Sequence, residues 1–161
     1  MPIRAQEHIA AAALQAVARA GAYLESARLD LGAPAPGERR WTRLAHARAF
    51  DAWLIAWGPD SAIPAHDHGD SAAALMLLEG SLVEFSRESS DPRHWVAREL
   101  APGIAVEVPT RRIHHVANQG ISVAASLHVY SPPLADLTFH DDFGSRQDAG
   151  SRQLVTTGAL A

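Results

Sequence analysis

Apolar residues recur at helical spacing near the N-terminus and give way to short, strand-like apolar runs further along the chain. Alanine and leucine dominate residues 5–28, where apolar side chains stand three or four positions apart, so this segment predicts an α-helix. The segment 32–37 is rich in glycine and proline, which ends the helix and provides a short linker. We therefore expect an N-terminal helix within residues 1–31.

Several apolar runs separated by glycine and proline follow the linker. The runs that we expect to form strands are 50–57, 73–78, 81–86, 94–100, 103–108, 113–117 and 121–130. Hairpin turns are predicted at Glu79-Gly80 and at residues 118–120, and Pro132 ends the last long strand. Short strands with this punctuation indicate an all-β sandwich or barrel. We expect the barrel at 38–143, a poorly packed C-terminal tail at 144–161, and a single domain overall.

Composition narrows the chemistry that this chain can carry. Its 161 residues are 47% hydrophobic and 20% charged, with a formal net charge of −4 and no cysteine. This balance suits one globular domain. The sequence has no long basic run and no long apolar run, so we expect neither nucleic acid nor a membrane as a partner. Without cysteine, disulfides, thiolate metal sites and cysteine nucleophiles are excluded. A metal would need His, Asp or Glu, so the nine histidines become the main candidates.

Two groups of polar residues recur at strand spacing. His66 and His68 stand at i and i+2, so both imidazoles point to one face of an extended strand and can reach one metal ion. Taken alone, this pair leaves metal binding and a structural role equally open. Ser126, His128 and Tyr130 also share one strand face, and such a polar row inside a barrel is costly unless it is hydrogen-bonded. We expect a chain in which His128 orients the Tyr130 hydroxyl.

A second pattern accompanies the histidine pair. The spacing G-x5-P-x4-H-x3-N is formed by Gly103, Pro109, His114 and Asn118. Together with the H-x-H pair and Gly80, it resembles the two motifs of the cupin superfamily. The resemblance implies a double-stranded β-helix, or jelly-roll, barrel in which His114 joins His66 and His68 as a metal ligand.

The pattern departs from the cupin motifs at two places. The usual glutamate ligand falls on Ala72 or Ala73, so the implied site consists of three histidines. Arg111 stands where cupins often have glycine, which affects the local turn rather than the ligand. Imidazole suits Fe, Zn, Cu and Ni alike, so the ligand type does not select the metal.

The resemblance extends to a particular branch of the cupins. Its segments are 57–58, 65–71, 77–80 and 126–133, within an overall match that spans residues 41–142. They resemble the thiol dioxygenases, the cysteine dioxygenase family among them. In that family Ser126, His128 and Tyr130 would form the catalytic Ser-His-Tyr relay, and the Ser131-Pro132 bond that follows would be cis.

Two further positions follow from this resemblance. Trp41-Thr42-Arg43 resembles the family's Tyr-x-Arg segment, which implies that Arg43 grips the substrate carboxylate through its planar fork. Trp41 replaces the tyrosine, so one hydroxyl is lost. The family's thioether crosslink joins a cysteine to the relay tyrosine, and the matching position is Ala73. No Cys-Tyr crosslink can form, and Tyr130, which would also contact substrate, must act unmodified.

The resemblance implies a non-haem Fe(II) thiol dioxygenase, an oxidoreductase that adds both atoms of O2 to L-cysteine and yields cysteine sulfinic acid. One Fe(II) per chain, a small thiol and O2 would be its cofactor and substrates. Alternatives remain open: a dioxygenase for another thiol such as 3-mercaptopropionate, a metal-binding cupin without oxygenase activity, or a Zn or Ni hydrolase or lyase at the same site. No secretory signal pattern is present, so we expect a cytoplasmic protein, either a monomer or a weak homodimer.

The remaining histidines and tryptophans have less specific expectations. His115 points to the opposite strand face from His114 and should not be a ligand. Trp53 and Trp57 are expected in the core. Solvent exposure is expected for His8, His46, His94, His140, Arg111 and Arg112, and either of the two arginines could instead supply a second substrate-binding cation.

Overall fold

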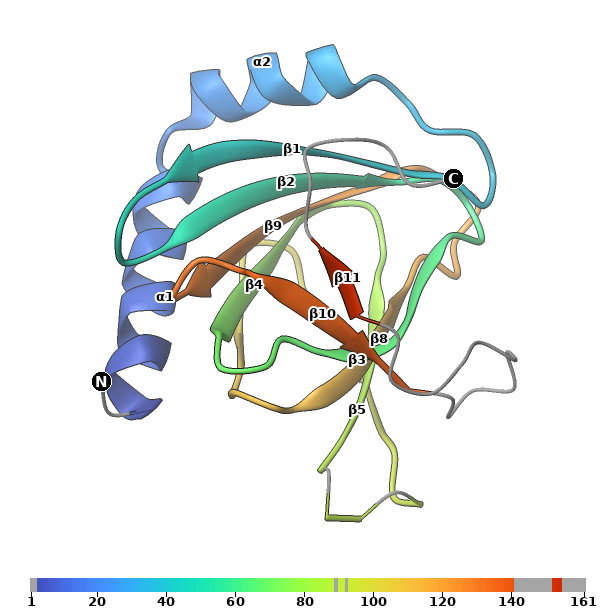
Figure 1. Ribbon diagram of the computed structural model, residues 1–161. Helices are drawn as coiled ribbons and strands as arrows, with labels where there is room; N and C mark the ends of the chain where they lie inside the picture. Colours follow the sequence, from blue (N-terminus) through green and yellow to red (C-terminus); the bar gives the residue numbers. More distant parts are fainter. Residues whose placement is uncertain (1–2, 89, 92, 141–151, 155–161) are drawn as a thin grey trace.

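The computed structural model describes residues 3–88, 90–91, 93–140 and 152–154. In this part of the chain, two helices precede a series of short strands (Figure 1). The elements are α1 (Ile3–Ala18), α2 (Gly21–Leu31), β1 (Arg39–His46), β2 (Asp51–Trp57), β3 (Ala62–Asp67), β4 (Ala72–Glu79), β5 (Val83–Arg87), β6 (Val96–Glu99), β7 (Ala105–Val108), β8 (Ile113–Ala117), β9 (Ala124–Ser131), β10 (Asp136–Phe139) and β11 (Arg152–Leu154).

The strands form two sheets that face one another. One sheet has the order β1-β2-β9-β4-β7, and the other has the order β11-β10-β3-β8-β5-β6. Neighbouring strands pair antiparallel throughout the described residues, and β4 and β9 lie side by side although about fifty residues separate them in sequence. An all-β barrel preceded by helical structure is therefore confirmed.

The N-terminal segment forms two helices, so the expectation of one continuous helix over 5–28 is wrong. α1 ends at Ala18 and α2 begins at Gly21, because the chain changes direction at Ala20, whose φ of −81° and ψ of 51° are not helical. α1 packs on β4 and β9, whereas α2 covers β1 and β2 (Figure 1). One straight helix could not follow both of these parts of a twisted sheet.

The central strands of the first sheet, β2, β4 and β9, are buried on both faces. Its inner face contributes Trp53, Trp57, Leu75 and Tyr130 to the barrel core. Its outer face packs against the helices through a second cluster, formed by Ala10, Ala13, Leu14, Leu24, Ala52, Ala74, Met76, Leu127 and Val129. Because both faces exclude water, β2, β4 and β9 are nearly continuous apolar runs, which made them visible in the sequence.

The sequence pattern missed β1, β3 and β10. These strands are only partly buried, and their mixed polar and apolar residues lack a clear alternation. The predicted tail at 144–161 lies outside the described residues, apart from β11, which pairs with β10. The Ser131-Pro132 bond is cis.

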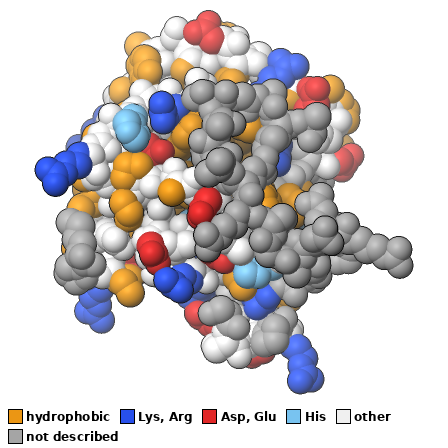
Figure 2. Space-filling model, viewed as in Figure 1, with side chains coloured by type: hydrophobic (Ala, Val, Ile, Leu, Met, Phe, Trp, Pro, Cys, Tyr) orange, Lys and Arg blue, Asp and Glu red, His pale blue; other side chains and the backbone are white. Residues whose placement is uncertain are grey.

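The face of the molecule in Figure 2 shows no concentration of one charge among the described residues. On the face in Figure 2, acidic and basic side chains are interspersed among apolar and other polar groups. Within the described residues, neither helix combines the length and apolar character needed to cross a membrane.

Candidate metal centre

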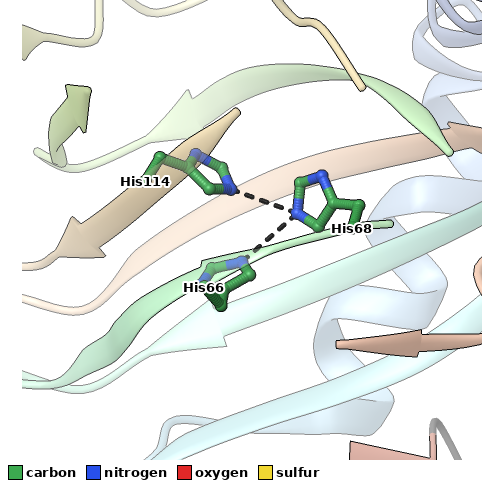
Figure 3. Close-up of side chains that lie close together, drawn as sticks. All are labelled: His66, His68 and His114. Atoms are coloured by element: carbon green, nitrogen blue, oxygen red, sulfur yellow. Dashed lines mark hydrogen bonds between the residues drawn. The ribbon is translucent and has the colours of Figure 1, made fainter. Parts of the chain in front are cut away.

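Three histidines from two neighbouring strands converge inside the barrel (Figure 3). His66 near the end of β3 lies directly opposite His114 of β8, and His68 follows at the start of the next turn. The Nε2 atom of His68 lies 3.2 Å from that of His66 and 3.1 Å from that of His114. All three side chains are buried. The structure thus brings together the three ligands that the sequence motifs implied.

The hydrogen-bond partners of these rings leave the Nε2 lone pairs of the three histidines pointing at one another. His66 Nδ1 lies 2.8 Å from the Pro64 carbonyl oxygen, and His114 Nδ1 lies 2.8 Å from a Glu84 carboxylate oxygen. Both partners only accept hydrogen bonds, so each Nδ1 carries a proton, and in the metal-binding form of each ring an unprotonated Nε2 points inward. A single proton on His68 Nε2 cannot satisfy both neighbours. A bound metal cation resolves this conflict, so the residues present fit a metal ion.

Electrostatics favour the neutral, metal-binding form of His66 and His68. Burial lowers the pKa of His66 and of His68 well below the usual histidine value, and the nearby His114 lowers both further. At neutral pH these imidazoles therefore keep their lone pairs available. No proton has to leave either ring before a metal can bind.

Glu84 of β5 orients one ligand, and the sequence analysis missed it. Its side chain is 1% exposed and holds His114 Nδ1, while its second oxygen accepts a hydrogen bond from Arg98 Nε at 3.2 Å. Burial raises the pKa of the Glu84 carboxyl, but the hydrogen bond from His114 and the Arg98 guanidinium outweigh it and lower the pKa to about 2. The carboxylate is thus ionised and fixes the His114 tautomer. The sequence signal for this role was a carboxylic acid at position 84, flanked by the apolar residues Val83 and Phe85 of a predicted strand.

Replacing Glu84 by glutamine is expected to weaken metal binding at the three histidines about 10- to 100-fold, because His114 loses an ionised orienting partner. Anaerobic titration of the metal-free protein with Fe(II) measures this. Glu88→Gln is the matched control, since Glu88 pairs with Arg112 rather than with a histidine. Equal Fe(II) affinity in Glu84→Gln and wild type would contradict the role assigned to Glu84.

A polar row on β9 lies beside the histidines. Ser126, His128 and Tyr130 are all buried and share the inner face of the strand. Ser126 Oγ lies 2.8 Å from His128 Nε2, and the His128 and Tyr130 rings stack with centroids 6.4 Å apart. The Tyr130 ring in turn meets His68 edge-on, with centroids 4.9 Å apart. This row of side chains therefore extends to His68, a candidate metal ligand.

Trp57 of β2 extends this row. Its side chain is completely buried, as expected of a core residue, and its indole N–H donates a 2.8 Å hydrogen bond to Ser126 Oγ. Because the indole can only donate, Ser126 accepts from it and uses its own proton toward His128 Nε2. Burial, and to a smaller extent the nearby His114, lower the pKa of His128 to about 3, so the ring is neutral and carries its proton on Nδ1.

Tyr130 keeps its hydroxyl proton. Burial raises the pKa of Tyr130 above its usual value, and the Asp51 carboxylate raises it further. Ala73 of β4 lies directly opposite Tyr130 in the strand pairing. The position that would carry the crosslinking cysteine is thus beside the tyrosine but holds alanine. Tyr130 is an unmodified phenol that can donate a hydrogen bond next to the metal ligands.

Arg43 lies at the edge of the site. It is opposite Trp53 in the β1–β2 pairing, and Trp53 is opposite His128 in the next pairing. The Arg43 side chain is exposed, with its guanidinium 5.6 Å from the centre of the Trp53 ring. Arg43 also lines a pocket of about 320 Å³ between α2 and β1. The structure thus places Arg43, with an exposed side chain, in the same cross-strand row as His128.

Two of the other histidines differ in their surroundings. His115 meets the ring of Phe85 and does not belong to the triad, as expected for the opposite strand face. The expectation that His140 is exposed is wrong, because it is partly buried and its Nε2 lies 2.7 Å from Asp67 Oδ2. This contact depends on the pairing of β10 with β3, which the sequence pattern did not reveal.

The fold and the site together define a class: a cupin-type double-sheet barrel with a three-histidine metal centre. A cupin superfamily protein from Desulfitobacterium hafniense DCB-2 superposes with a TM-score of 0.51 over 63% of this chain and 84% of that chain, at 16% identity. The family model of cysteine dioxygenase type I matches residues 23–142. The chain therefore belongs to the cysteine dioxygenase type I family.

Individual relatives are distant. Cysteine dioxygenase type 1 of Rattus norvegicus is 27% identical over 135 residues, which cover 69% of this chain and 64% of the relative. The chain thus spans somewhat less than two thirds of the length of that relative. The solved structure of TT1209 from Thermus thermophilus has a TM-score of 0.55 and 27% identity, covering 65% of this chain and 92% of that chain.

Proposed function

We propose that this protein is a non-haem Fe(II) thiol dioxygenase that converts L-cysteine and O2 to cysteine sulfinic acid, with one Fe(II) per chain. The observation that carries the proposal is the convergence of three imidazole Nε2 atoms, with the protonated phenol of Tyr130 packed against the ligand His68. Membership of the cysteine dioxygenase family supports the same reaction. We further expect the protein to act in the cytoplasm, as a monomer or weak homodimer.

The donor set suits this chemistry. With three neutral ligands and no carboxylate among them, a bound Fe(II) would retain its full positive charge, favour a thiolate over a thiol, and offer open positions for sulfur and O2. The reaction balances without another reagent: the S–H proton is released, both oxygen atoms end on sulfur, and the four electrons that sulfur loses reduce O2. Holding both reactants in one buried site supplies much of the rate enhancement.

The chain's own groups bind and orient the reactants. Tyr130 donates a hydrogen bond to the oxygen atoms or to the substrate beside His68. Ser126 and His128 act behind Tyr130, and the Trp57 indole fixes the direction of their hydrogen bonds. Arg43 is assigned to the substrate carboxylate, on the strength of the family resemblance and of its position across Trp53 from the relay.

An oxygen electrode tests the reaction directly. Fe(II)-loaded protein given L-cysteine should consume O2 and form sulfinate in a 1:1 ratio, measured by mass spectrometry. Metal-free and Zn-loaded protein serve as controls, since turnover by either one, or without O2, would favour a hydrolase or lyase. Iron binding without oxygen uptake from cysteine or 3-mercaptopropionate would contradict a thiol dioxygenase and favour a binding protein.

One observation supports a second substrate, 3-mercaptopropionate. Trp41 stands where the resemblance has a tyrosine, so a hydroxyl is missing near the assigned carboxylate contact. A panel of both thiols at fixed pH, compared by kcat/KM, decides which thiol the site prefers. A higher value for cysteine supports the main proposal.

Replacing Tyr130 by phenylalanine is expected to lower kcat about 100-fold while iron content stays unchanged, because the phenol donates a proton or hydrogen bond but does not hold the metal. Steady-state oxygen uptake and metal analysis measure the two effects. The matched control is Tyr23→Phe, since the Tyr23 hydroxyl binds the Leu44 carbonyl at the surface. Unchanged kinetics in Tyr130→Phe would remove this residue from the reaction.

A further inference from the structure

Phe139 of β10 is an aromatic side chain beside the histidine triad that the proposed reaction has not used. In the pairing of β10 with β3, Phe139 lies directly opposite His66. Residues that are directly opposite in an antiparallel pair point to the same face of the sheet. The Phe139 ring centroid lies 6.0 Å from that of His66, with 48° between the ring planes. The ring therefore packs against a candidate metal ligand on the inner face of the barrel.

The row that contains Phe139 and His66 continues across the second sheet. His66 lies opposite His114 of β8, and His114 lies opposite Ser86 of β5. The four side chains therefore share the inner face. Phe139 borders the two histidines on one side of the row, and the small hydroxyl of Ser86 borders them on the other. The bulky apolar member of this row is Phe139.

β10 is fastened to β3 immediately after Phe139. The His140 backbone N–H donates a 2.8 Å hydrogen bond to the Ala65 carbonyl oxygen. The His140 ring adds a second contact, because its Nε2 lies 2.7 Å from Asp67 Oδ2. The Phe139 ring is thus carried by a backbone that is fixed relative to the ligand strand. A ring held in this way cannot yield to a bulky group without a cost in packing.

Two aromatic rings border the triad. The Tyr130 ring meets His68 with centroids 4.9 Å apart, and the Phe139 ring lies beside His66. Tyr130 has a hydroxyl that can act in the reaction, whereas Phe139 has only apolar atoms. Its effect on a bound thiol is therefore to exclude volume. The carbon bonded to sulfur is the part of a thiol that follows the sulfur into the site, so groups on this carbon meet the rings first.

We propose that Phe139 is a specificity-determining residue, whose ring excludes thiols that are branched at the carbon bonded to sulfur. L-cysteine has a CH2 group at that carbon and fits beside the ring, whereas L-penicillamine has two methyl groups there and does not. This inference rests on the proposed function, because it concerns the substrates of the same site. One methylene more or less in an apolar site changes affinity about 10- to 200-fold.

Anaerobic calorimetric titration of Fe(II)-loaded protein with L-cysteine and L-penicillamine tests this assignment without turnover. The two thiols carry the same carboxylate and amino groups and differ only in the two methyl groups. Wild type should bind L-penicillamine at least about 10-fold more weakly than L-cysteine. In Phe139→Ala, L-penicillamine should bind about 10-fold more tightly than in wild type, because the methyl groups then have room. The affinity for L-cysteine should change little.

L-homocysteine is a further probe, because it is longer than cysteine but unbranched at the carbon bonded to sulfur. Its affinity should not rise in Phe139→Ala. The matched control is Phe85→Ala, since Phe85 lies in the same sheet opposite His115, on the outer face, and this variant should leave all three affinities unchanged. Phe139→Leu keeps a smaller apolar side chain and should give an intermediate gain. It carries the comparison if the alanine variant fails to fold or to retain iron.

The assignment is wrong if wild type binds L-penicillamine as tightly as L-cysteine, if the folded Phe139 variants keep the wild-type affinity ratio, or if L-homocysteine gains as much as L-penicillamine. Oxygen uptake separates this inference from the proposed function. Discrimination between the thiols through Phe139 without oxygen consumption by the wild type contradicts the dioxygenase and supports the role of Phe139. Oxygen consumption with a thiol preference that does not depend on Phe139 does the reverse.

Discussion

Replacing His68 by alanine is expected to abolish stable iron binding and, with it, thiol-dependent oxygen uptake. His68 is the central member of the triad, because its Nε2 atom lies within 3.2 Å of those of both His66 and His114. Removing a direct ligand should cost more than the 10- to 100-fold loss typical of an outer partner, so we expect Fe(II) affinity to fall by more than about 100-fold.

The His68→Ala variant tests metal binding without removing a hydrogen bond that supports the fold. The Nδ1 atom of His68 has no hydrogen-bond partner among the described residues, so the alanine variant breaks no structural hydrogen bond there. His115→Ala is the control, because that ring lies next to His114 in sequence but outside the triad. Metal analysis of purified protein, anaerobic titration and an oxygen electrode give the readouts. Iron retained at the wild-type level in His68→Ala would show that the triad is not the metal site.

Replacing Gly80 by alanine is expected to destabilise the barrel strongly. Gly80 forms the turn after β4 with φ of +80°, a left-handed conformation that costs other residues about 1–2 kcal/mol. A Cβ atom there would also lie 2.7 Å from the Ala124 Cα on β9, and overpacking of this kind adds about 1–3 kcal/mol. The combined cost lowers the melting temperature by roughly 5–15 °C in a domain of this size.

Gly103→Ala separates these two effects. Gly103 has φ of +76°, but a Cβ added there meets no atom within 4 Å. It should therefore show only the conformational cost, about 1–2 kcal/mol. Thermal unfolding of both variants, followed by circular dichroism, measures the difference. Equal melting temperatures for the two variants would contradict the close approach of the turn to β9.

Much of the fold could be predicted because several strands have a strong local signal. β2, β4 and β9 are buried and mostly apolar, apart from the polar row on β9, since helices cover one face of their sheet and the barrel core covers the other. β1, β3 and β10 escaped prediction because partial burial leaves a mixed pattern. The helix break at Ala20 also depends on packing, because each helix follows a different part of the sheet.

Local spacing by itself determined part of the site. The i, i+2 spacing of His66 and His68, where β3 ends, predicted that both rings point the same way, and the same rule aligns Ser126 with His128 and Tyr130 on β9. The lack of cysteine excluded a crosslink on composition alone. These features needed only residue identity and the period of a strand.

Only the tertiary structure decided which groups surround these residues. Glu84 reaches His114 across thirty positions, and Trp57 reaches Ser126 across sixty-nine. Phe139 of β10 lies beside the triad because of its register with β3. Pairing between strands that are distant in sequence sets each of these contacts. A local sequence pattern predicts the face on which a side chain lies, but it does not predict which residue of the partner strand contacts that side chain.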